Sequence, residues 1–299
     1  MLFAATQKGF GVLAGAIDMG YASNIGCVVT FKEKVAISFE HHIIRLCEKH
    51  CIPAFYWSEA KGSLESKIVQ FDISSLIAIG WRYLLPLSLN KLLCFPMIVF
   101  HDSLLPKYRG FAPTPTAIIA GECKVGVTAL FASNEIDNGE IIWQKVVPVG
   151  EHDYIQDVIN KQSDAYIEGF MYMLDLMCKN KSIPSIPQEE KLATYSIWRT
   201  REDCRINWKT DSRSVFNFVR ALGTPYPGAY TYYKEKRITV LRTSLIPDLT
   251  FAIRDCGKLW AIKENRPQVI CGIGMISIDK AIDESGQEVI FDTLRYKLH

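Results

Sequence analysis

Short apolar runs alternate with helix-like stretches through the first half of the chain, and this alternation constrains the fold most. The runs have strand length and lack polar–apolar alternation, which is typical of strands buried on both faces. They cover residues 1–5, 25–30, 52–57, 75–79 and 96–100, with helical stretches at 10–19, 39–50 and 63–71. The pattern predicts an α/β fold with a doubly wound, Rossmann-like, mostly parallel sheet, whose ligands bind beyond the carboxyl ends of the strands.

A long amphipathic helix is predicted over residues 153–178, because apolar side chains recur there at three- and four-residue spacing. The polar segment that follows contains Pro184 and Pro187, which cannot continue a helix or join a central strand. We therefore expect the first domain, the catalytic one, to cover residues 1–182 and the second to cover residues 190–299.

The second domain reads as mainly antiparallel β structure, and an OB-like barrel is one form it could take. Its sequence offers one short helix and several strand-like runs separated by turn signals. The helix covers residues 211–222, the strands cover 229–233, 238–242, 259–262 and 269–278, and the turns lie at 234–236 and 265–267.

Charge and cysteine content narrow the class of partner. The 34 basic and 32 acidic side chains give a net charge of +2, which does not favour nucleic acid or a membrane surface as partner. The apolar residues 1–20 lack a basic leader and are interrupted by Lys8 and Asp18, so we expect neither signal peptide nor membrane span. Nine scattered cysteines without zinc-type spacing suggest reduced thiols, no metal and a cytoplasmic protein.

The chemistry-bearing residues gather between residues 100 and 142. His101 directly follows an apolar run, which places it at the end of a buried strand, and Asp137 lies in a loop after the strand-like sequence GVTALFA. Such a pair can meet at the carboxyl edge of the sheet, where a carboxylate orients a histidine base. The alternative is a structural histidine and an aspartate that only forms a turn.

The sequence VFHDSLLPKYRG (99–110) carries a family resemblance, together with the Gly-Val-Thr strand and the Asp-x-Gly loop that follow. It resembles the pattern Asn-x-His-x-Ser-Leu-Leu-Pro-x-Tyr-Arg-Gly of the folate-dependent formyltransferases, which act on methionyl-tRNA, glycinamide ribonucleotide or amino sugars. His101 and Asp137 match that family's catalytic residues. The resemblance implies formyl transfer from N10-formyltetrahydrofolate to an amine, without a metal.

One position departs from the family pattern: Val99 stands where the family has a catalytic asparagine. In the family, the asparagine amide hydrogen-bonds the developing oxyanion, and loss of one such donor costs about 2.7–4 kcal/mol of transition-state stabilisation. Protonated His101, the Ser103 hydroxyl or a backbone N–H could take over this role. The carboxylate of Asp102 would repel the oxyanion.

The resemblance also implies binding residues. The sequence IGWRYLLP (79–86) matches the family's loop against the pterin, where Gly80 allows close approach and Trp81 and Tyr83 offer flat surfaces; ordinary aromatic packing is the alternative. The expected folate-binding residues are Gly80, Trp81, Arg82, Tyr83, Leu84 and Asp137. The expected substrate-binding residues are Lys8, Gly9, Tyr108, Arg109, Gly110, Tyr226 and Tyr230.

Residues 193–233 point to the amine that is formylated. Trp198-Arg199, Ile206 to Trp208 and Pro225 to Ala229 resemble UDP-aminoarabinose and dTDP-aminosugar formyltransferases, although a related pattern occurs in methionyl-tRNA formyltransferase. The implied substrate is a dTDP- or UDP-linked amino sugar. Its N-formyl product would serve surface polysaccharides such as lipopolysaccharide O-antigen.

Two other functions stay open. Methionyl-tRNA would need an extended basic surface, yet the first forty residues carry only Lys8, Lys32 and Lys34 as cations. The second open function is that of a binding protein, which has lost catalysis together with the asparagine. The strands of the second domain also leave a homodimer open.

Overall fold

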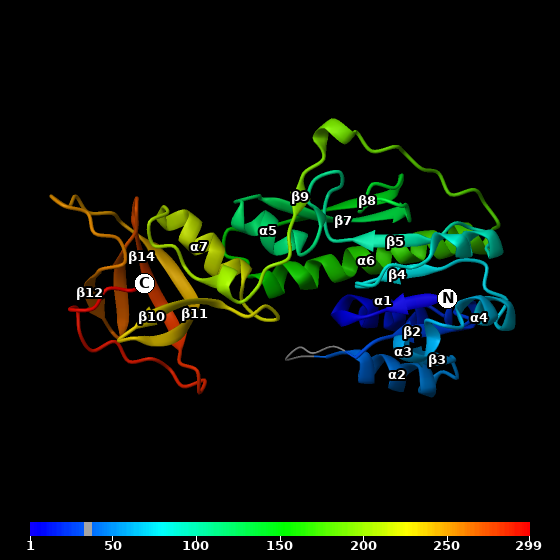
Figure 1. Ribbon diagram of the computed structural model, residues 1–299, viewed down its shortest axis with the longest axis horizontal. Helices are drawn as coiled ribbons and strands as arrows, with labels where there is room; N and C mark the ends of the chain where they lie inside the picture. Colours follow the sequence, from blue (N-terminus) through cyan, green and yellow to red (C-terminus); the bar gives the residue numbers. More distant parts are fainter. Residues whose placement is uncertain (33–37) are drawn as a thin grey trace. The chain divides into compact units, whose positions relative to one another are not determined.

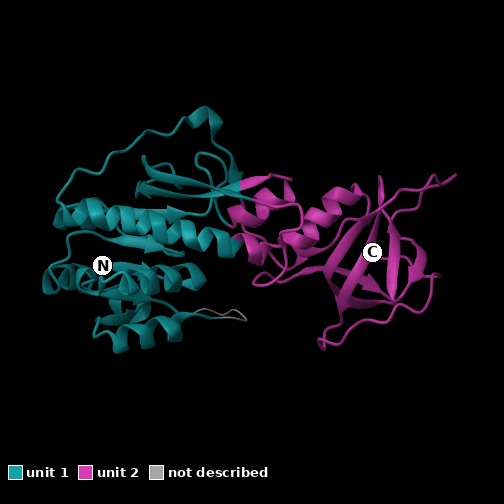
Figure 2. Cartoon of the chain, turned by 180° about the vertical axis from the view of Figure 1, so that it is seen from behind, with its two compact units in different colours: residues 1–111, 125–148, 159–196 teal, residues 112–124, 149–158, 197–299 magenta. Residues whose placement is uncertain are grey.

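The protein is described here by a computed structural model covering residues 1–32 and 38–299, so Lys34 lies outside the described residues (Figure 1). The chain divides into two compact units, coloured separately in Figure 2. Unit 1 comprises residues 1–111, 125–148 and 159–196, and unit 2 comprises residues 112–124, 149–158 and 197–299. The expected consecutive domains, 1–182 and 190–299, stay a prediction.

Unit 1 is built on a seven-stranded sheet with the order β3-β2-β1-β4-β5-β7-β8. The strands are β1 (Leu2–Ala4), β2 (Val28–Thr30), β3 (Ala54–Tyr56), β4 (Ile77–Ile79), β5 (Ile98–His101), β7 (Lys124–Phe131) and β8 (Ile141–Pro148). The first five strands pair in parallel, and β5 pairs antiparallel with β7. This mostly parallel sheet confirms the predicted fold class, and the five predicted apolar runs are its five parallel strands.

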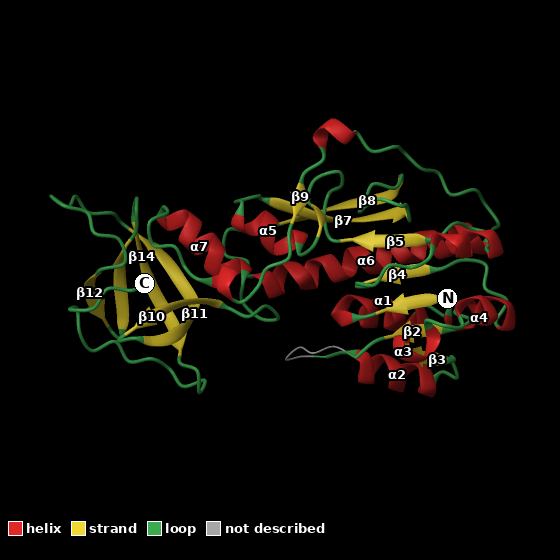
Figure 3. Ribbon diagram, in the orientation of Figure 1, coloured by secondary structure: helices red, strands yellow, loops and turns green. Residues whose placement is uncertain are grey.

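Helices cover both faces of this sheet (Figure 3). The α-helices of unit 1 are α1 (Thr6–Asp18), α2 (Glu40–Lys49), α3 (Trp57–Ala60), α4 (Leu64–Gln70) and most of α6 (Ile155–Cys178), and its 3-10 helices are η1 (Ala22–Asn24), η2 (Leu87–Leu92) and η3 (Glu190–Leu192). The sequence predicted α1, α2, α4 and α6 but missed the single turn of α3. The packing face of α4 joins Phe3, Val29 and Ala78 in one apolar cluster, whereas α6 packs on the opposite face.

Alternation along β5 decides which side chains can meet. Val99 packs against the apolar cluster on the α4 face. The ring of Phe100 instead lies 5.6 Å, centroid to centroid, from the ring of Tyr166 in α6. Because successive strand residues point to opposite faces, His101 shares the face of Val99.

Unit 2 contains a five-stranded antiparallel sheet with the order β10-β11-β14-β13-β12. Its strands are β10 (Ala229–Tyr233), β11 (Lys236–Ile246), β12 (Leu259–Lys263), β13 (Arg266–Ile270) and β14 (Met275–Ile282), and its helices are α5 (Pro113–Ile119), η4 (Glu202–Cys204) and α7 (Ser212–Ala221). The antiparallel character is as predicted.

The single strand predicted over residues 269–278 is wrong, because the chain turns back between β13 and β14. The N–H of Cys271 donates to the carbonyl of Gly274, whose φ is +77°. A Cβ on Gly272 would lie 2.1 Å from the carbonyl oxygen of Lys209. Two glycines within an apolar run thus form a hairpin turn that apolarity alone does not reveal.

All nine cysteines carry free thiols. Within residues 1–32 and 38–299, no helix combines the length and apolarity needed to cross a membrane.

Candidate active site

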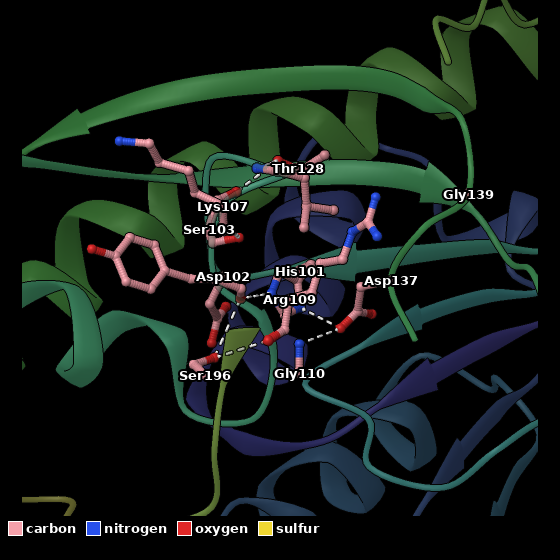
Figure 4. Close-up of polar contacts among 12 residues, drawn as sticks. His101, Asp102, Ser103, Lys107, Arg109, Gly110, Thr128, Asp137, Gly139 and Ser196 are labelled. Carbon is pink, nitrogen blue, oxygen red and sulfur yellow. Dashed lines mark hydrogen bonds and ion pairs between the residues drawn. The ribbon is translucent and has the colours of Figure 1, made fainter. Parts of the chain in front are cut away.

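His101 and Asp137 lie together at the carboxyl edge of the unit 1 sheet (Figure 4). His101 is the last residue of β5, and Asp137 lies in the loop between β7 and β8, called here the Asp137 loop (132–140). Nδ1 of His101 is 3.4 Å from Oδ2 of Asp137. The two side chains are 9% and 20% exposed, so water screens their interaction only weakly.

Backbone contacts fix the Asp137 carboxylate. The N–H of Gly110 donates to Oδ2 at 2.8 Å, and Asp137 itself has a left-handed φ of +50°. A Cβ on Gly139 would lie only 1.8 Å from the carbonyl oxygen of Phe131, so the end of this loop packs directly on the backbone of β7. Gly110 thus holds the Asp137 carboxylate through its N–H, and Gly139 lets the loop pack closely because it has no side chain.

The second ring nitrogen of His101 is also engaged. Nε2 lies 2.9 Å from the backbone carbonyl of Tyr108, a residue with φ of +60°. Both ring nitrogens therefore face oxygen atoms that can only accept, and only the doubly protonated ring donates to both. Tyr108 contributes its carbonyl to this contact, whereas the sequence suggested a substrate-binding side chain.

Ser103 does not fit the predicted role of oxyanion donor. Its side chain is buried, and its hydroxyl donates to the carbonyl of Lys107 at 2.7 Å. The carbonyl of Ser103 accepts from the hydroxyl of Thr128 at 2.6 Å. Because Ser103 has one hydroxyl proton, that proton is used within the loop in this structure, and its catalytic role stays a prediction.

Lys8 also departs from its predicted role. Its ammonium forms an ion pair with Asp102, whose other carboxylate oxygen accepts from the hydroxyl of Tyr166. Burial raises the pKa of Asp102, but the charge and hydrogen bond of Lys8 and the hydrogen bond of Tyr166 outweigh this and leave the pKa lowered. The contact with Tyr166 places this ion pair on the α6 face, so Lys8 is neutralised on the side of the sheet opposite His101.

The neighbouring Gly9 has a packing role in the structure. A Cβ at this position would lie 2.9 Å from the backbone of Ala4, so Gly9 lets α1 start close to the end of β1.

Arg109 was expected to bind a substrate phosphate, but it is only 1% exposed. Its guanidinium donates to both carboxylate oxygens of Glu190, at 2.8 and 2.9 Å, and to Oε1 of Gln188, at 2.9 and 3.2 Å. All of these contacts lie within unit 1. The guanidinium thus binds the segment after α6 internally, and no sequence pattern had marked Gln188 or Glu190.

The loop after β4 carries the predicted folate residues. Gly80 has φ of +62°, and a Cβ there would lie 2.4 Å from the carbonyl oxygen of Ala5. Ala78 pairs with Val99, so the end of β4 lies beside the strand that ends at His101. The close packing against Ala5 leaves no room for a side chain at Gly80.

The aromatic side chains after Gly80 pack on other aromatic rings of unit 1. Trp81 makes edge-to-face contacts with Phe31 and Trp57, and Tyr83 stacks on Trp57 at 5.6 Å. The indole N–H of Trp81 is buried and has no hydrogen-bond partner. Arg82 lies over the ring of Phe31, and Leu84 is 94% exposed.

The other two predicted substrate-binding tyrosines, Tyr226 and Tyr230, belong to unit 2. Tyr230 is in the apolar core of that unit, 7% exposed, with the guanidinium of Arg237 4.0 Å from its ring centre. It therefore packs as a core residue, and its predicted role is not supported. Tyr226 is partly exposed, and its N–H donates to the carbonyl of Gly223. In the part of the chain that the structure describes, no group of three His, Cys, Asp or Glu side chains could hold a metal ion.

The fold and the site together define the class: a two-unit α/β protein with a histidine at the end of a parallel strand and an aspartate in the loop between β7 and β8. Two family models match the chain, one described as formyl transferase over residues 17–174 and one as the formyl transferase C-terminal domain over residues 199–293. The first covers more than half of the chain. The chain therefore belongs to the formyl transferase family.

Curated relatives are similar over part of their length. Methionyl-tRNA formyltransferase from Halalkalibacterium halodurans is 33% identical over 197 residues, which are 64% of this chain and 61% of the relative. Methionyl-tRNA formyltransferase from Staphylococcus aureus is 32% identical over 203 residues, which are 68% of this chain and 65% of the relative. The chain thus spans less than two thirds of the length of these relatives.

Solved structures share the fold over nearly the whole chain. A sugar 3N-formyl transferase, in the presence of dTDP and 5-N-formyl-THF, matches with a TM-score of 0.66 and 17% identity over 97% of both chains. An N-formyltransferase from Helicobacter canadensis, in complex with folinic acid and dTDP-3-aminofucose, matches with a TM-score of 0.65 and 17% identity over 96% of this chain and 98% of its own.

Proposed function

We propose that this protein transfers the formyl group of N10-formyltetrahydrofolate to the amine of a nucleotide-linked amino sugar. The observation that carries the proposal is the contact between His101 and Asp137 at the carboxyl edge of the sheet, inside the sequence motif of the family. The site residues named below are part of the proposal.

The residues after β4 fit a flat donor. Gly80 packs closely against Ala5, and the rings of Trp57, Trp81 and Tyr83 that pack on one another offer flat surfaces. A buried indole N–H without a partner costs free energy unless a bound group accepts its hydrogen bond. The polar edge of a pterin is one such acceptor. Two of the solved relatives hold 5-N-formyl-THF or folinic acid, which supports a folate here.

Formyl transfer forms a C–N bond to the amine, breaks the C–N10 bond of the donor, and moves one proton from the amine to N10. His101 serves this proton transfer, and Asp137 orients the ring and stabilises its protonated form. Nε2 becomes available to the reacting groups when it leaves the carbonyl of Tyr108, its partner in this structure.

The oxyanion needs another donor because Val99 offers none and Ser103 is engaged. Protonated His101 is a cation on the face where Val99 lies, whereas Lys8 is neutralised on the opposite face. We therefore assign charge stabilisation of the oxyanion to the imidazolium.

Two observations favour an amino sugar over methionyl-tRNA. The sugar formyltransferase structures match this chain over 97% and 96% of its length, whereas a methionyl-tRNA formyltransferase structure from Clostridium thermocellum covers 73% with a TM-score of 0.53. The net charge of +2 also provides little attraction for a polyanion. The curated relatives, which are methionyl-tRNA formyltransferases, support tRNA as the second candidate.

The test incubates the protein with N10-formyltetrahydrofolate and either dTDP- and UDP-linked amino sugars or methionyl-tRNA, and detects the formylated amine by mass spectrometry. We expect formylation of a nucleotide sugar, no formylation of methionyl-tRNA, and loss of activity in His101→Ala. Formylation of methionyl-tRNA alone would replace the sugar with tRNA as substrate. Binding of folate and nucleotide without turnover would support a catalytically impaired binding protein.

A further inference from the structure

The segment after α6 crosses both loops that build the site. We define the strap as residues 186–196. At its start, Ile186 exchanges two backbone hydrogen bonds of 2.8 Å with Ile141, where the Asp137 loop meets β8. At its end, β9 (Tyr195–Ser196) pairs in parallel with β6 (Arg109–Gly110), directly after the loop that carries Tyr108. The strap is thus attached to both loops by backbone hydrogen bonds.

Gln188 makes the side-chain link between the two loops. Its Nε2 donates to the backbone carbonyls of Asp137, at 2.7 Å, and Gly139, at 2.8 Å. Its Oε1 accepts from Nε and Nη2 of Arg109. The Gln188 amide thus uses its NH2 group as donor and its oxygen as acceptor. Its partners also fix its orientation, because a flipped amide would turn its oxygen toward two carbonyls and its NH2 group toward a guanidinium.

Arg109 fixes the other end of this link. Its buried guanidinium is anchored by Glu190, also in the strap, and the backbone N–H of Arg109 donates to the carbonyl of Thr194 at 2.8 Å. The next residue, Gly110, donates its N–H to the Asp137 carboxylate. A continuous path of hydrogen bonds therefore runs from the strap to the carboxylate that faces His101.

The Asp137 loop needs such support. Asp137 is held at φ of +50°, which costs free energy for a residue with a side chain, and its carboxylate lies 3.4 Å from Nδ1 of His101. A small displacement of the loop would break that contact. Misplacement of catalytic groups by about 1 Å can reduce rates about a hundredfold.

We propose that Gln188 is a positioning residue: its side-chain amide ties the guanidinium of Arg109 to the backbone of the Asp137 loop and so holds the Asp137 carboxylate against His101. The expected effect on the rate rests on the proposed function. The position of the His101 ring can be measured without turnover.

Two variants separate the contacts of Gln188. Gln188→Glu keeps the size and the acceptor for Arg109 but replaces the NH2 donor with an oxygen that repels the two carbonyls. Gln188→Met keeps the length and removes all hydrogen bonds. Gln70→Glu and Gln70→Met are matched controls, because Gln70 is exposed at the end of α4.

We expect both Gln188 variants to lower kcat about tenfold to a hundredfold, while KM for the donor and the amine stays within about threefold, because the loop moves but the binding surfaces remain. The second readout is the nitrogen-15 NMR signal of the His101 ring, assigned through its absence in His101→Gln. We expect this signal to shift in both Gln188 variants and not in the Gln70 variants.

Unchanged kcat together with an unchanged His101 signal would overturn the proposal. So would a fall in kcat that follows a fall in melting temperature while the His101 signal stays in place, since that result describes a structural role only. If the wild-type protein transfers no formyl group, the ring signal alone decides: a shift confined to the Gln188 variants would support the positioning role while the proposed function fails.

Discussion

Nδ1 of His101 and Oδ2 of Asp137 are 3.4 Å apart, although β6, α5 and β7 lie between these residues along the chain. The same carboxylate oxygen accepts the N–H of Gly110. Asp137 therefore contacts both the imidazole and Gly110 in β6. A substitution of Asp137 can remove its charge while it keeps an oxygen that accepts a hydrogen bond.

Asp137→Asn tests the charge. The amide oxygen can still accept from Gly110, but the variant cannot stabilise a protonated His101. We expect formyl transfer to fall at least about a hundredfold, with little change in melting temperature. Steady-state kinetics with a thermal melt would check this, and transfer near the wild-type rate would contradict the assigned pair.

Ser103→Ala distinguishes a structural hydroxyl from a catalytic one. The buried hydroxyl donates to the backbone carbonyl of Lys107, so we expect the free energy of unfolding to fall by about 1–3 kcal/mol. We expect kcat to stay within about threefold, because this proton is not directed at the site. Urea unfolding and single-turnover kinetics measure the two effects, and a hundredfold loss of rate without loss of stability would restore Ser103 as the oxyanion donor.

Trp81→Phe removes the unpartnered indole N–H and keeps an aromatic ring. No internal hydrogen bond is lost, so any change in the stability of the unliganded protein comes from the smaller ring alone. The affinity for folinic acid should fall about fivefold to tenfold, as for the loss of one hydrogen bond. Calorimetric titration would measure the affinity, with Trp260→Phe in unit 2 as control. Equal affinities in the two variants would exclude the indole N–H as a folate contact.

Asp102→Asn should change how stability depends on pH. Lys8 and Tyr166 lower the pKa of Asp102 in the folded state despite burial, so its carboxylate stabilises the fold above the usual pKa of about 4. This contribution is lost as the pH falls through the lowered pKa. The stability difference between wild type and variant should therefore be large at neutral pH and shrink in acid.

Urea unfolding at pH about 7 and about 3 measures this difference. Asp18→Asn, at the exposed end of α1, is the control. A difference that stays the same at both pH values would show that the charge of Asp102 does not contribute.

The strand–helix pattern of unit 1 was predictable because apolar runs of strand length have few other ways to bury themselves. The five parallel strands and four of the helices follow from it, and so does the position of His101 at the end of β5. The turn at Gly272 and Gly274 was missed because two glycines in an apolar run are compatible with either a strand or a turn.

Local patterns and a contiguous motif were enough to predict the class of fold and to propose His101 and Asp137 as the catalytic pair. The pairing of the charged side chains could be read only from the folded chain. Lys8 and Asp102 are 94 residues apart, and Arg109 and Gln188 are 79 apart, so no local pattern links them. A cation becomes a substrate ligand or an internal anchor according to the group that chain folding places beside it, because burial makes an unpaired charge costly and a paired one stable.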